Sequence, residues 1–157
     1  MLTVDGLLTG LHESHHVAMV LYLGREVVSV NRKAAPGQHG QVIWKGSTPV
    51  QAQMIYLAPA VAMLGETPLT HFNYDCREAL KLGSLAAAVI LVQEAQRDAR
   101  YRRMMNSCWS LLNGRLELTA DDIAEVRGAC RDPATRRARA AGRREPRAPR
   151  RGRVREL

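Results

Sequence analysis

Two histidines and a glutamate near the N-terminus have the residue types and the spacing of a hydrolytic metal site. The segment His12-Glu13-Ser14-His15-His16 fits the pattern H-E-x-x-H. On a helix, residues four apart lie one turn apart on the same face, so His12 and His16 can ligate one ion. Glu13 then stands beside the ion, where it can take a proton from a water that the metal activates. The segment predicts a zinc site for peptide-bond hydrolysis, with Glu13 as the general base.

The surrounding residues predict the helix that this motif needs. Apolar side chains recur at helical spacing from Leu7 to Leu21, and Gly24 is a typical residue for a helix end. We therefore expect a helix over residues 4–23. The plainer interpretation is a half-exposed helix that carries three histidines without binding a metal.

A third metal ligand must come from another part of the chain. Catalytic zinc usually takes three protein ligands and leaves a fourth position for water. Met19 and Tyr22 stand where the longer pattern H-E-x-x-H-x-x-G-x-x-H has its glycine and its third histidine. We expect His15 to face away from the metal or to line the cleft, and His39 lies in a glycine-rich loop without a partner. The remaining candidates are Glu66, His71, Asp75 and Glu78.

Each of these candidates also has an ordinary structural interpretation. Asp75 stands where a polar loop gives way to an apolar helix, so it can serve simply as a helix cap or first-turn acid. Glu78 is one turn further on and fits a solvated helix face. His71 fits an ordinary loop histidine.

The rest of the body predicts a mainly α fold with a small β-hairpin or sheet, of the α+β class. Residues 26–31 and 41–44 are rich in β-formers and frame a loop with Pro36 and Gly37, which predicts a hairpin. A helix is expected over residues 49–64, with Ser47 or Thr48 as its cap and with Pro59 kinking or locally breaking it. Further helices are expected from residues 73–75 to about 99, over 101–113, and from a capping box at Thr119 through 129.

The positive charge is concentrated at the C-terminal end. The net charge is +8, and residues 131–157 hold eleven arginines against three acidic residues, so the first 130 residues are neutral. These last residues have almost no apolar side chains and cannot bury enough surface to fold. We therefore expect a folded domain over residues 1–130 and a disordered Arg-rich tail over 131–157. Such a tail could bind nucleic acid or an acidic partner non-specifically.

The three cysteines and the hydropathy bear on the cell compartment. Cys76, Cys108 and Cys130 are widely spaced and form no CxxC pair, which argues against a disulfide framework and a cysteine zinc knuckle. No signal peptide is recognised, and the longest apolar run, residues 85–92, is too short to span a bilayer. We expect a cytoplasmic protein without a membrane span, and the oligomeric state stays open.

The order of these features resembles the zinc peptidase domain of the FtsH family of ATP-dependent metalloproteases, and more closely its small stand-alone members without the ATPase. The resemblance covers roughly residues 8–130 and is specific only in the motif helix. It is carried by HESHHVAMV (12–20), GREVVSV (24–30), YLAPAVAM (56–63), NYDCREA (73–79) and the start of the last helix (118–123). Where the family has a Gly/Ala-rich turn in its second helix, this chain reads Ala58-Pro59-Ala60.

This resemblance implies a function for the whole domain. It implies Zn²⁺ held by His12, His16 and Asp75, with Glu13 as the catalytic base. It also implies that a polypeptide substrate lies along the edge of the strand pair as an added strand. The alternative is a catalytically inactive peptidase-like interaction module, in which the Arg-rich tail binds the partner.

Overall fold

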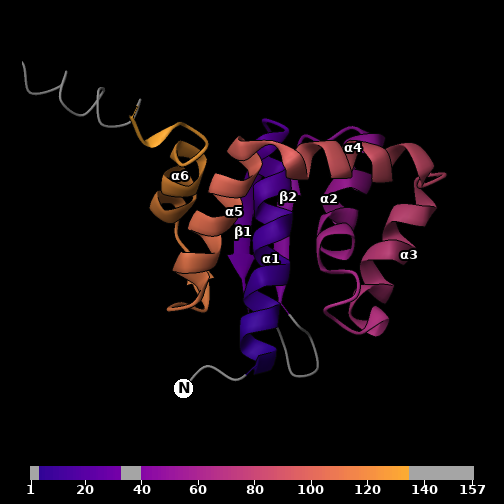
Figure 1. The fold of residues 1–157 in the computed structure, drawn as a ribbon, viewed down its shortest axis with the longest axis horizontal. Coiled ribbons are helices and arrows are strands. Elements are labelled where there is room, and N and C mark those ends of the chain that lie inside the picture. Colours follow the sequence, from indigo (N-terminus) through magenta and orange to yellow (C-terminus); the bar gives the residue numbers. More distant parts are fainter. Residues whose placement is uncertain (1–3, 33–39, 135–157) are drawn as a thin grey trace, which may run out of the picture.

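The computed structural model describes residues 4–32 and 40–134, and within these ranges the fold is mainly helical with one small sheet, as predicted (Figure 1). The expected loop, with His39, and nearly all of the expected Arg-rich tail lie outside the described residues. The elements are α1 (Val4–Tyr22), β1 (Glu26–Asn31), β2 (Gln41–Lys45), α2 (Pro49–Met63), a short 3₁₀ helix η1 (Leu69–Phe72), α3 (Asn73–Lys81), α4 (Ala86–Arg97), α5 (Ala99–Leu112), β3 (Glu117–Leu118) and α6 (Ala120–Gly128).

Helix α1 is the centre of the domain (Figure 1). It packs against α5 and α2 and also contacts β1. Every residue from Glu13 to Leu21 is buried. The helix ends in a Schellman motif, in which Gly24 has a φ of 71° and its N–H donates to Leu21 O, while Arg25 N–H donates to Val20 O. This ending turns the chain directly into β1.

The sheet is antiparallel and has the strand order β2-β1-β3. The predicted hairpin of β1 and β2 is confirmed, with Val30 opposite Val42. Strand β3 was not predicted, because its two residues carry no pattern of their own and pair with β1 only through the tertiary fold. Strand β2 pairs with β1 along one side and forms an edge of the sheet.

Helix α2 begins at a full capping box and runs through its proline. The Thr48 side chain accepts from Gln51 N–H, and the Gln51 side chain accepts from Thr48 N–H. The expected local break at Pro59 is wrong, since the helix continues to Met63. Proline removes one helical hydrogen bond, and a single missing bond need not end a helix that is packed on both sides.

The single helix expected from residue 73 to about 99 is also wrong, because α3 and α4 are separate helices. Gly83 lies between them with a φ of 130°, which ends the helical path. The buried Gln53 side chain of α2 donates to Ala79 O, Gly83 O and Ser84 O, so carbonyls near the end of α3 have a partner. The apolar spacing suggested continuity, but a contact from another helix stabilises the turn.

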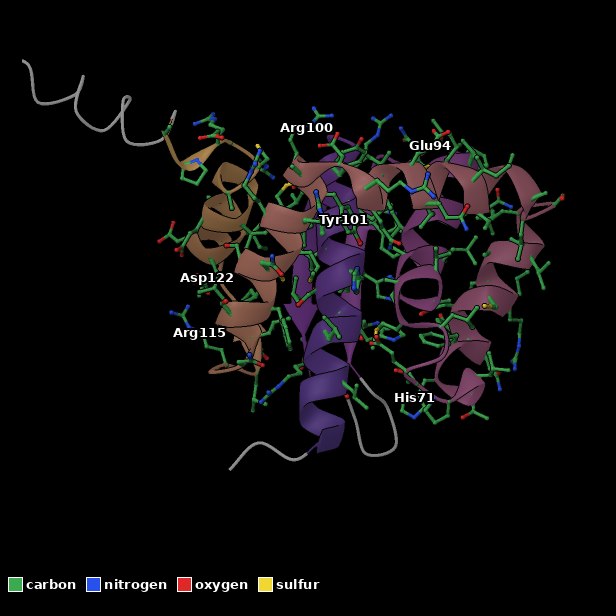
Figure 2. All side chains as sticks on the ribbon, viewed as in Figure 1. His71, Glu94, Arg100, Tyr101, Arg115 and Asp122 are labelled. Atoms are coloured by element: carbon green, nitrogen blue, oxygen red, sulfur yellow. The ribbon has the colours of Figure 1, made fainter. Side chains whose placement is uncertain are left out.

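The C-terminal part of the described chain supports α1 from the side opposite α2 (Figure 1). Thr119 and Asp122 form the predicted capping box at the start of α6, and Asp122 also pairs with Arg115 (Figure 2). Among the residues described, no helix has both the length and the apolar character needed to cross a membrane.

Candidate metal centre

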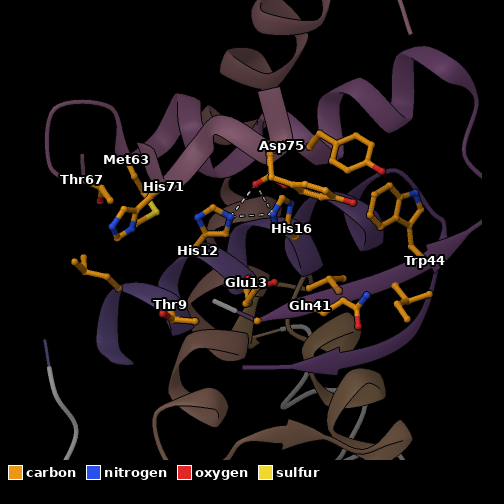
Figure 3. Close-up of a pocket in the computed structure, with 16 residues that line it drawn as sticks. Thr9, His12, Glu13, His16, Gln41, Trp44, Met63, Thr67, His71 and Asp75 are labelled. Atoms are coloured by element: carbon orange, nitrogen blue, oxygen red, sulfur yellow. Dashed lines mark hydrogen bonds and ion pairs between the residues drawn. The ribbon is translucent and has the colours of Figure 1, made fainter. Parts of the chain in front are cut away.

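Three of the predicted site residues converge in the structure (Figure 3). His12 and His16 come from successive turns of α1, and Asp75 comes from the first turn of α3. Asp75 Oδ2 lies 2.9 Å from His12 Nε2 and 3.1 Å from His16 Nε2, and the two Nε2 atoms are 3.1 Å apart. In a tetrahedral zinc site with bonds of about 2.0–2.1 Å, the ligand atoms lie about 3.3 Å from one another. A small outward movement of the three side chains therefore suffices to admit an ion.

The two histidine rings are held in different ways. His16 Nδ1 donates to Ile55 O of α2 at 2.7 Å, and this contact is buried. The His12 ring stacks on Phe72 with centroids 5.7 Å apart and an angle of 11° between the planes. Both arrangements turn Nε2 towards Asp75. Sequence reasoning missed Phe72 and the Ile55 carbonyl, since neither belongs to a recognisable metal motif.

Glu13 lies beside this cluster and is almost fully buried. Burial raises the pKa of its carboxyl group from 4.5 to about 7, and the negative charge of Asp75 adds to the rise while His16 opposes it. The backbone of Gly40 approaches closely: a Cβ built there would stand 3.0 Å from Glu13 Oε1 and 2.8 Å from Arg32 O. Gly40 has a φ of 126°, so glycine is required both by conformation and by space.

The charges within the cluster favour an ion pair in the metal-free protein. Burial works against a charge on His16, but the carboxylate of Asp75 outweighs it and raises the pKa of His16 to about 9. Burial likewise opposes the Asp75 anion, yet His16 and His12 hold its pKa well below the usual range. Burial lowers the pKa of His12, and the hydrogen bond with Asp75 offsets this only in part. One proton therefore resides on His16 at neutral pH, and it would have to leave for a metal to bind there.

The cluster opens into a cleft of about 590 Å³. Strand β2 lines this cleft from Gln41 to Trp44, and Tyr74 and His71 line it as well. Thr67 and His71 lie towards one end and Trp44 towards the other, with His12, His16 and Asp75 between them (Figure 3). The cleft thus places the edge strand of the sheet next to the candidate metal centre.

The alternative third ligands do not belong to this group of three residues. Glu78 pairs with Lys81 at 2.7 Å on α3. His71 lines the cleft, but its ring nitrogens are not grouped with the ligand atoms of the three converging residues. Glu66 is exposed. Among the described residues, His12, His16 and Asp75 are the group whose geometry could hold a metal ion.

His15 faces away from the cluster, as one of the two expectations had it. Its Nδ1 lies 2.7 Å from the hydroxyl oxygen of Tyr101 on α5, a residue that Figure 2 places beside α1. Burial lowers the pKa of His15 to about 3, so the ring is neutral and packs in the core. The Tyr101 hydroxyl is also within reach of His15 O and the Gln96 side chain. The unusual histidine inside the motif is thus a packing residue.

No protein-family model, curated protein or solved structure matches this chain. The interpretation of the site accordingly depends on the geometry of its own residues.

Proposed function

We propose that this chain is a zinc-dependent metallopeptidase. The observation that carries the proposal is the convergence of His12 Nε2, His16 Nε2 and Asp75 Oδ2 beside a buried glutamate at the floor of a cleft. Two of the three ligands and the glutamate belong to one H-E-x-x-H segment on a rigid, buried helix. The resemblance to the FtsH peptidase domain leads to the same function.

The donor set suits zinc. Two imidazole nitrogens and one carboxylate oxygen are typical ligands of catalytic zinc, and a three-ligand set leaves one position open towards the cleft. The open side matters because structural zinc sites are closed by a fourth protein ligand. A zinc ion held here would supply an acidified water and a Lewis acid for the scissile carbonyl.

Glu13 is the residue that would handle the proton. A general base works best when its pKa lies near the working pH, and burial raises the pKa of Glu13 to about 7. As the base, Glu13 takes a proton from the attacking water and later gives it to the leaving amine. Its burial keeps bulk water away, and Gly40 allows the cleft wall to approach its carboxylate.

Strand β2 would bind the substrate. It is an edge strand and lines the same cleft as His12 and His16. An extended peptide can pair with such an edge through backbone hydrogen bonds, which requires little of the peptide's sequence. This arrangement supports an unfolded polypeptide as the substrate class, with the scissile bond brought over the metal centre.

The experiment combines a zinc measurement with a cleavage assay on the purified chain. We expect about one zinc per chain and cleavage of an unfolded protein that stops on chelation and returns with zinc. Glu13→Gln should keep the zinc and lose cleavage by about a hundredfold or more. Asp75→Asn should lose most of the zinc, whereas the control Glu78→Gln, on the same helix, should keep both zinc and activity.

The outcomes separate the possible functions. If the chain binds zinc but cleaves no substrate under any condition, the result would favour an interaction module over an enzyme. Full metal-dependent cleavage by Glu13→Gln would exclude Glu13 as the base. Unchanged zinc in Asp75→Asn would exclude Asp75 as a ligand.

A further inference from the structure

In helix α2, Pro59 lies one turn after Ile55, whose carbonyl contacts His16 of the candidate metal centre. In an α-helix, the N–H of residue 59 would donate to the carbonyl of residue 55. Pro59 has no N–H, and a proline ring inside a helix also crowds the carbonyl four residues earlier. The Ile55 carbonyl therefore lacks its helical donor, and Ile55 itself is fully buried.

His16 supplies the missing donor. Its Nδ1 lies 2.7 Å from Ile55 O, in a buried contact between α1 and α2. Buried backbone carbonyls nearly always find a partner, and here the partner is a metal-ligating side chain from another helix. The gap that the proline leaves in one helix thus coincides with the position of the His16 ring.

This hydrogen bond determines which nitrogen of His16 faces the metal. With the Nδ1 proton held by Ile55 O, Nε2 points at Asp75 Oδ2 and His12 Nε2, both at 3.1 Å. Metal-binding histidines commonly depend on such a partner for ring orientation. His12 has a different support, since its ring stacks on Phe72.

We propose that Pro59 is a positioning residue of the metal centre, which keeps the Ile55 carbonyl available for His16 by withholding the helical N–H. An amide at position 59 would compete for this carbonyl and draw it back towards the axis of α2. The inference rests on the proposed metal site for its effect on zinc. The hydrogen bond itself can be tested without metal.

The test compares Pro59→Ala and Pro59→Gly with the control Pro49→Ala. Pro49 is in the first turn of the same helix, where a backbone N–H has no helical acceptor, so its absence there removes no helical hydrogen bond. We expect both changes at Pro59 to weaken zinc binding about tenfold in chelator competition. They should also speed hydrogen exchange at His16 Nδ1, followed by NMR on the metal-free protein. Pro49→Ala should alter neither.

Thermal stability separates positioning from general damage. Pro59→Ala restores a helix-favouring residue with an N–H, so its melting temperature should equal or exceed that of the wild type, while Pro59→Gly should melt below Pro59→Ala, because glycine is about 1 kcal/mol less favourable than alanine in a helix. Weakened zinc binding in both variants, despite their different stabilities, would support the inference. Wild-type zinc affinity and unchanged Nδ1 exchange in Pro59→Ala would overturn it. If the wild type binds no zinc, the proposed function fails, and the exchange measurement still decides the role of Pro59.

Discussion

Glu13→Gln should stabilise the metal-free protein at high pH, because the wild-type carboxylate is buried at a cost. Burial raises the pKa of Glu13 from 4.5 to about 7. A group whose pKa is higher in the folded state binds its proton more tightly there, so stability falls as the pH rises through about 7. One pKa unit corresponds to about 1.4 kcal/mol, which gives a loss of about 3 kcal/mol above pH 8.

Glutamine is nearly the same size and has no charge to bury, so the variant escapes this loss. Glu13 also supports the charge of His16, and losing that support removes part of the gain. We therefore expect Glu13→Gln to be more stable than the wild type by about 2–3 kcal/mol near pH 8.5 and nearly equal to it near pH 4.5.

The assay is urea unfolding of both proteins at the two pH values, with a chelator present. The matched control is Glu66→Gln, because Glu66 is exposed. Its stability should differ little from that of the wild type, because an exposed side chain stays in water when the chain folds. A stability difference for Glu13→Gln that stayed constant between the two pH values would refute the reasoning, since the carboxyl group would then not carry a raised pKa.

Three further predictions follow from the same contacts. Apparent zinc affinity, measured by chelator competition, should rise about tenfold per pH unit from neutrality. It should level off above the His16 pKa of about 9. An affinity that did not change with pH would contradict the presence of a proton on His16. The His16 proton also stabilises the metal-free fold below about pH 6.5, and this stabilisation is lost as the pH rises through about 9; Asp75→Asn should abolish that pH dependence in urea unfolding. Gly40→Ala should lower stability by about 1–3 kcal/mol and reduce cleavage, because the new Cβ meets two carbonyls and Glu13; wild-type unfolding and turnover would show that the loop adapts.

The local elements were largely predictable from the sequence. The motif helix, both strands of the hairpin, the capped start of α2 and the capping box of α6 follow from side-chain periodicity and from residues such as Gly24, Thr48 and Thr119. These signals depend on neighbours a few residues away, which a sequence displays directly. The split between α3 and α4 was not predictable in the same way, since Gln53 stabilises it from another helix.

In the candidate site, too, local spacing determined one part and tertiary packing decided the other. The sequence by itself determined that His12 and His16 share a helical face with Glu13 beside them, because residues four apart lie one turn apart on a helix. The residues themselves left the third ligand open among four positions, and only the resemblance to the FtsH peptidase family implied Asp75. Only the tertiary structure brings Asp75 Oδ2 to His12, which is 63 residues earlier, and to His16, which is 59 residues earlier. Glu78 pairs instead with Lys81, three residues further along the same helix. Tertiary packing also decided the role of His15, because Tyr101 on α5 turns it into the core.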